Sequence, residues 1–66
     1  MLFSAIIHKE DYIYVAECVE VGTVSQGLSI EEAVENLKES TELYLEEFPL
    51  EKPSKTYLTS FELEYA

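Results

Sequence analysis

Apolar and polar residues alternate with two different periods along this chain, and the change of period separates strands from a helix. Residues 2–8 and 12–17 are rich in β-branched and aromatic side chains, with a polar break at 9–11 between them. This arrangement favours a β-hairpin. A turn over residues 19–22 leads to a third short run at 23–26. We therefore expect three strands before any helix.

The start of a helix is the clearest local signal in the sequence. Ser29 is a favoured N-cap residue, and Glu32 stands at the position that completes a capping box. Gly27 ends the preceding strand, where a residue without a Cβ permits either a positive φ or a close approach of two backbones. We expect Gly27, Ser29 and Glu32 to have structural roles at this junction.

The segment after Ser29 has a helical period. Its apolar side is expected to be formed by Ile30, Ala33, Val34, Leu37, Thr41, Tyr44, Leu45 and Phe48. The opposite side carries Glu31, Glu35, Lys38, Glu39, Glu42 and Glu46. Pro49 and Pro53 are expected to end the helix and to stiffen the loop that follows it.

Alternation with a period of two returns near the C-terminus. One side of residues 57–65 carries Tyr57, Thr59, Phe61, Leu63 and Tyr65, and the other carries Leu58, Ser60, Glu62 and Glu64. This pattern predicts a fourth strand with one buried face. The expected fold is a single two-layer α+β domain over residues 1–66, in the order β-β-β-α-β. An antiparallel meander would be joined by the fourth strand, beside and parallel to the first, after a right-handed crossover.

Both faces of the first hairpin carry apolar residues. Ile7 and Ile6 lie on opposite sides of the first strand, as Tyr14 and Val15 do on the second. One helix can cover only one face of the sheet. We therefore expect another chain to cover the second face, most simply in a homodimer.

The charge of the chain is strongly acidic. Fourteen Asp and Glu residues accompany only four Lys and Arg, and the net charge is −10. Direct binding of nucleic acid is disfavoured, because it depends on cationic side chains that contact phosphates. A basic protein would instead be attracted. With no membrane-spanning or secretory pattern in the sequence, we expect a cytoplasmic protein.

The sequence predicts no catalytic, cofactor or metal site. His8 has only Glu10 and Asp11 as nearby hydrogen-bond partners, Cys18 has no basic neighbour, and Ser25 has no partner base. One His and one Cys do not form a converging set of metal ligands. We expect no enzymatic activity, and an unrecognised hydrolase is the minor alternative.

The order of segments over residues 12–47 resembles the antitoxins of the HicB family. The resemblance rests on Tyr14-Val-Ala16, Gly22, Ser25-Gln-Gly27, Glu31-Glu-Ala33, Asn36 and Leu43-Tyr-Leu45. It implies a HicA-like toxin as partner, a small basic ribonuclease whose catalytic histidine such antitoxins cover. Many longer relatives append a DNA-binding domain. The sequence to Ala66 contains none, so we expect a short form that does not bind an operator alone.

Two functional interpretations follow. In the first, the domain is a protein-binding antitoxin that neutralises a basic toxin by steric cover. Glu35, Glu39 and Glu42 would attract the partner, and Tyr12 and Tyr14 would contact it. In the second, the domain is a self-associating structural or regulatory module with no toxin partner.

Overall fold

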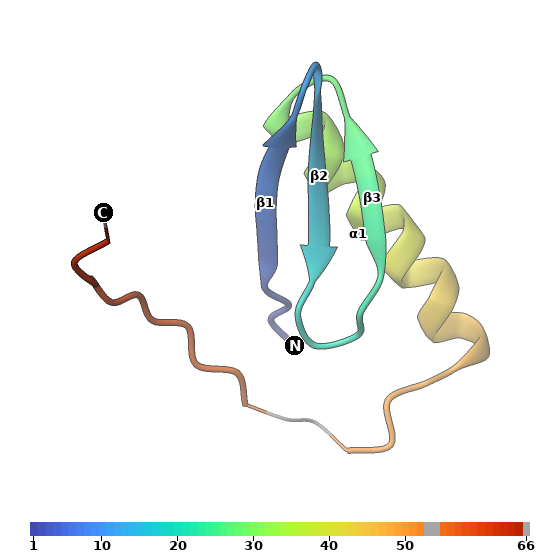
Figure 1. The fold of residues 1–66 in the computed structure, drawn as a ribbon. Coiled ribbons are helices and arrows are strands. Elements are labelled where there is room, and N and C mark those ends of the chain that lie inside the picture. The colour runs from blue at the N-terminus through green and yellow to red at the C-terminus, as the bar shows by residue number, and fades with distance from the viewer. Residues whose placement is uncertain (53–54, 66) are drawn as a thin grey trace.

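A computed structural model describes residues 1–52 and 55–65 of the chain. Three strands, β1 (Ala5–Glu10), β2 (Ile13–Cys18) and β3 (Val24–Gly27), precede one helix, α1 (Ile30–Glu47). The strands form an antiparallel sheet in the order β1-β2-β3, and α1 lies behind one face of it (Figure 1). The predicted α+β class and three-stranded meander are confirmed.

The hairpin between β1 and β2 is tighter than the sequence pattern predicts. Lys9 and Glu10 belong to β1, and Glu10 pairs directly with Ile13. Only Asp11 and Tyr12 remain for the turn, with Asp11 at a φ of 51°. Aspartate tolerates this left-handed conformation better than most residues, so the polar break is shorter than expected.

The core lies between α1 and the β2–β3 half of the sheet, and it is small. Its buried residues are Ala16, Cys18, Ala33, Leu37 and Thr41. Ile7, Tyr14 and Val21 pack around them and are partly buried. Most of these buried side chains are short, so the apolar area removed from water is modest even for a domain of this size.

Gly27, Ser29 and Glu32 hold the start of α1 against β3. The Ser29 hydroxyl accepts a hydrogen bond from the Glu32 amide at 3.1 Å, which identifies Ser29 as the N-cap. The Glu32 carboxylate accepts from the amide of Leu28 at 3.1 Å, one residue earlier than in the standard capping box. Gly27 does not have a positive φ. Its role is the close backbone approach to Ala33.

The second half of α1 extends beyond the sheet. Tyr44 and Phe48, both expected on the buried face, are 43% and 58% exposed. The cause is length, because the helix has 18 residues and β3, which it packs against, has only four. The two rings pack on each other instead, with their centroids 5.0 Å apart.

The expected fourth strand is not found in this structure. Residues 55–65 form neither helix nor strand, and Figure 1 shows this segment running outside the sheet on the β1 side. Alternation predicts that a segment suits a half-buried strand, but a strand also needs an edge with which to pair its backbone. Pro53, which was expected to stiffen the preceding loop, lies outside the described residues.

The sheet face opposite α1 carries a mixture of apolar and polar side chains. Alternation from the buried residues places Ile6, Val15 and Val24 on this face, with His8 and Glu17 among them. Ile6 and Val24 are both more than half exposed. The prediction of a second, uncovered face is therefore correct, although the face is more polar than expected.

Candidate protein-binding surface

The acidic residues chosen from the sequence share one exposed face of α1. Glu35, Glu39 and Glu42 follow i, i+4 and i+7 spacing, and all three are exposed. Among the described residues, none of their carboxylates lies in a salt bridge. These three glutamates outnumber Lys38, which lies on the same side of the helix, so the face has a negative potential that favours a basic partner.

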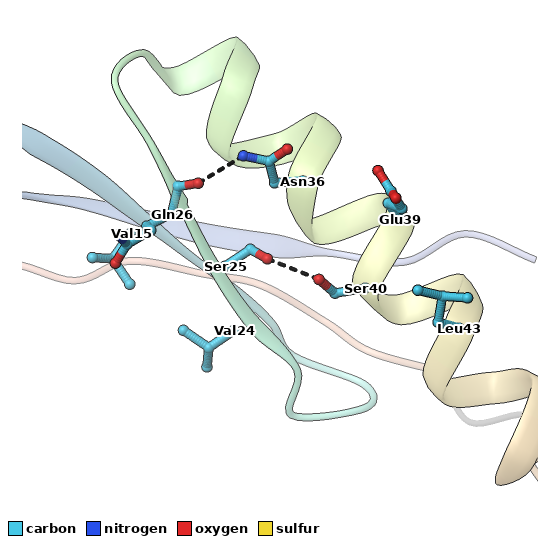
Figure 2. Close-up of a pocket in the computed structure, with 8 residues that line it drawn as sticks. All are labelled: Val15, Val24, Ser25, Gln26, Asn36, Glu39, Ser40 and Leu43. Atoms are coloured by element: carbon cyan, nitrogen blue, oxygen red, sulfur yellow. Dashed lines mark hydrogen bonds between the residues drawn. The ribbon is translucent and has the colours of Figure 1, made fainter.

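A groove runs between this helix face and the outer edge of β3. Its volume is about 530 Å³, and it is lined by Val15, Val24, Ser25, Gln26, Asn36, Glu39, Ser40 and Leu43 (Figure 2). Glu39 supplies charge, while Val24 and Leu43, which are 56% and 59% exposed, supply apolar area. A surface that combines exposed aliphatic side chains with a charged margin suits protein association.

Polar contacts hold the two walls of the groove together. The Ser25 and Ser40 hydroxyls are 2.9 Å apart, and Asn36 Nδ2 donates to the Gln26 carbonyl at 2.8 Å (Figure 2). Just before β3 begins, the Thr23 hydroxyl lies 2.7 Å from the Thr41 hydroxyl. These bonds fix β3 relative to α1, so the groove is preformed and little conformational freedom is lost when a partner binds.

The two tyrosines chosen as contact residues have different environments. Tyr12 lies in the hairpin turn and is 89% exposed, so its ring is free to contact a partner. Tyr14 is half-buried on the helix side of β2, and Lys9 Nζ lies 5.7 Å from the centre of its ring. Neither residue lines the groove beside α1. The structure therefore brings the three glutamates together but does not join the tyrosines to them.

Val24 and Leu43 are the groove residues that sequence reasoning missed. The sequence pattern assigned Val24 only to a strand, and Leu43 was named only as part of the resemblance to the HicB family. A signal for Leu43 existed, because it follows Glu39 by four residues and therefore lies on the same helix side. No comparable signal marked Val24, since its exposure depends on which sheet face α1 covers.

The residues considered for catalysis are separated by the fold. His8 Nε2 lies 3.2 Å from Glu10 Oε1 on the exposed sheet face. Cys18 is buried, and its thiol is directed at Glu20 Oε1 at 3.7 Å. The Ser25 hydroxyl pairs with Ser40. Within residues 1–52 and 55–65 no group of three or more His, Cys, Asp or Glu side chains is placed to hold a metal ion.

The Glu20 carboxylate interacts with residues that are distant from it in the sequence. The Ser4 amide donates to Glu20 Oε1 at 2.6 Å. This bond is the main cause that lowers the pKa of Glu20 from 4.5 to about 2, and the nearby Ser4 and Thr56 hydroxyls lower it further. Glu20 thereby links the start of β1, the β2–β3 loop and the beginning of the C-terminal segment.

The structure defines a small α+β domain with a groove between a sheet edge and an acidic helix. The chain is similar to a UPF0150 protein of Helicobacter pylori strain J99, with 50% identity over 46 residues. The matched region covers 68% of this chain and 64% of that protein, so the chain spans less than two thirds of its relative. No protein-family model and no solved structure matches the chain.

The relative from Helicobacter pylori is named only as a UPF0150 protein. That name states no binding partner and no activity. Across the described part of the chain, no helix is both long enough and apolar enough to span a bilayer. Function must therefore be inferred from the surface itself.

Proposed function

We propose that this domain is a HicB-like antitoxin module of the cytoplasm, which binds a small basic ribonuclease of the HicA type and covers its catalytic site. It would have no catalytic activity of its own. The observation that carries this proposal is the exposed glutamate face of α1, which adjoins a preformed groove containing Val24 and Leu43.

Charge and shape have separate roles in this proposal. Glu35, Glu39 and Glu42 would attract a basic partner at long range and raise its association rate. Val24 and Leu43 would then lose their water contacts and slow dissociation. The HicB resemblance over residues 12–47 and the UPF0150 relative are compatible with this function.

If a small basic protein is encoded beside this gene, the test expresses it together with this chain. We expect a stable complex, and we expect the ribonuclease activity of the partner to fall as the chain is added. A Val24→Glu/Leu43→Glu variant should lose both effects while keeping its helical circular dichroism. Inhibition that is unchanged in this variant would exclude the groove as the contact surface.

The alternative is a self-associating module without a toxin. The observation that favours it is the uncovered sheet face, on which Ile6 and Val24 are 53% and 56% exposed. Failure to recover a basic partner, together with a stable homo-oligomer, would make this alternative the better account.

A further inference from the structure

We propose that residues 57–65 pair as a β-strand with the free edge of β1 in a second copy of this chain. Two such contacts, related by a two-fold axis, would form a strand-exchanged dimer. This inference concerns an edge and a segment outside the groove, and it does not depend on a toxin partner.

The first observation is the state of the C-terminal segment. Residues 57–65 form no helix or strand, although large apolar side chains recur at every second position of much of this segment. The large apolar side chains are almost fully in water: Tyr57 is 82% exposed, Phe61 81%, Leu63 78% and Tyr65 95%. So many exposed aromatic and aliphatic groups in one short segment indicate a surface that is covered in an assembly.

The second observation is that β1 presents unpaired backbone groups. The Val19 amide donates to the Ser4 carbonyl at 2.9 Å. Because hydrogen-bonded pairs alternate along an antiparallel ladder, Ile6 and His8 also direct their amides and carbonyls toward β2. Ala5, Ile7 and Lys9 must direct theirs outward. Along the described chain no strand pairs with this edge, which makes it a template for a further strand.

The opposite edge of the sheet is less available. The same alternation directs the Gln26 carbonyl away from β2, and Asn36 Nδ2 already donates to it at 2.8 Å (Figure 2). Helix α1 also packs mainly against β3 and β2. A strand that approached β3 would have to displace this bond, so β1 is the favoured edge.

Side chains on β1 would gain cover from the added strand. Ile7 lies on the helix side of the sheet but is only partly buried, because α1 packs over β2 and β3. Phe3, in the segment before β1, is 37% exposed. One alternating side of residues 57–65 supplies Tyr57, Phe61 and Leu63, which are large enough to pack beside them.

The partner is a second copy because of how the segment leaves its own domain. Thr56 and Tyr57 line one cavity together with Ser4 and Glu20, so the segment begins near the start of β1. From there it diverges from its own sheet and does not pair with it (Figure 1). Strand exchange leaves the fold of each domain unchanged. It pairs the free backbone groups of β1 and at the same time covers the exposed side chains of residues 57–65.

The experiment measures the mass of full-length variants by sedimentation at micromolar concentration. The wild type should have twice the monomer mass of 7.6 kDa. Phe61→Pro/Glu62→Pro removes two consecutive amides, so it blocks pairing whichever edge of the strand faces β1. This variant should be a monomer. The control Phe61→Thr/Glu62→Thr removes the same ring and charge but keeps both amides and a β-prone sequence, and should still dimerise.

A second variant blocks the edge itself. Lys9→Pro removes an outward amide from an exposed position of β1, and it should also give a monomer with the circular dichroism of the wild type. Mixing it with Phe61→Pro/Glu62→Pro combines one intact strand with one intact edge. We expect the mixture to recover a heterodimer. This result requires pairing between chains and excludes pairing within one chain.

Three results would overturn the proposal. A monomeric wild type would mean that residues 57–65 do not pair between copies. A mixture that stays monomeric even at concentrations high enough for the single remaining contact would contradict pairing between chains. Dimers that persist in both proline variants would assign the association to the uncovered sheet face. Because residues 57–65 form no helix or strand in the single domain, the Phe61→Pro/Glu62→Pro variant keeps the test valid even if Lys9→Pro does not fold.

Discussion

Gly27 lies so close to the first turn of α1 that a Cβ at this position would be 2.6 Å from the backbone nitrogen of Ala33. The two nearest atoms, Ala33 N and Glu32 C, belong to the main chain of the helix, which cannot move as the end of a flexible side chain can. This contact determines how near α1 comes to β3, and therefore the shape of the groove between them.

The first prediction is that Gly27→Ala lowers the free energy of unfolding by about 1–3 kcal/mol, because the added methyl group forces the strand and helix apart. Denaturant titration followed by circular dichroism measures this change. The matched control is Gln26→Ala at the adjacent exposed position, which should stay within about 0.5 kcal/mol of the wild type. Equal losses in both variants would contradict the close-approach explanation.

The second prediction concerns the N-cap of α1. Ser29→Ala should lower the free energy of unfolding by about 1 kcal/mol, because the Glu32 amide loses the hydroxyl that accepts its hydrogen bond. Ser29→Asp restores an acceptor and should be close to the wild type. Denaturation midpoints of the three proteins decide the matter, and identical midpoints would show that the cap contributes nothing.

The third prediction concerns acid stability. The folded-state pKa of Glu20 is about 2 and its ordinary value is 4.5. A lowered pKa means that the ionised carboxylate stabilises the fold above 4.5, and that this contribution is lost as the pH falls toward 2. Glu20→Gln does not titrate, so its stability should fall less than that of the wild type over this interval.

Unfolding titrations at several pH values between 4.5 and 2 test the Glu20 prediction. Glu46→Gln, which removes an exposed helix carboxylate, provides a control that should follow the wild-type profile. Parallel profiles for Glu20→Gln and the wild type would show that the Ser4–Glu20 bond does not contribute to acid unfolding.

The fourth prediction concerns electrostatic attraction of a basic partner. Reversing Glu35, Glu39 and Glu42 to Lys should lower the association rate at low ionic strength by at least about tenfold, with a smaller effect at high salt. Stopped-flow mixing with the basic partner measures the rate. The matched control reverses Glu10, Glu17 and Glu51, which changes the net charge equally on other surfaces and should slow association less. Equal effects would indicate that only net charge matters.

Local signals in the sequence were sufficient for much of the fold. Strand propensity predicted the meander, and the Ser29 and Glu32 pattern predicted where α1 begins. The helical period correctly placed Ala33 and Leu37 inside and the glutamates outside. These features depend on residues within a few positions of one another, so they can be predicted without knowledge of distant contacts.

Other features were decided only by tertiary structure. The exposure of Tyr44 and Phe48 depends on where the sheet ends beneath α1. The helical period of the sequence carries no information about the length of the sheet. Likewise, Tyr12 and Tyr14 differ because one occupies a turn and the other faces the core. The Glu20 carboxylate accepts a hydrogen bond from Ser4, which is far from it in the sequence. Residues 57–65 have the alternation of a strand, but a strand exists only where an edge accepts its backbone, and that edge is a property of the assembled fold.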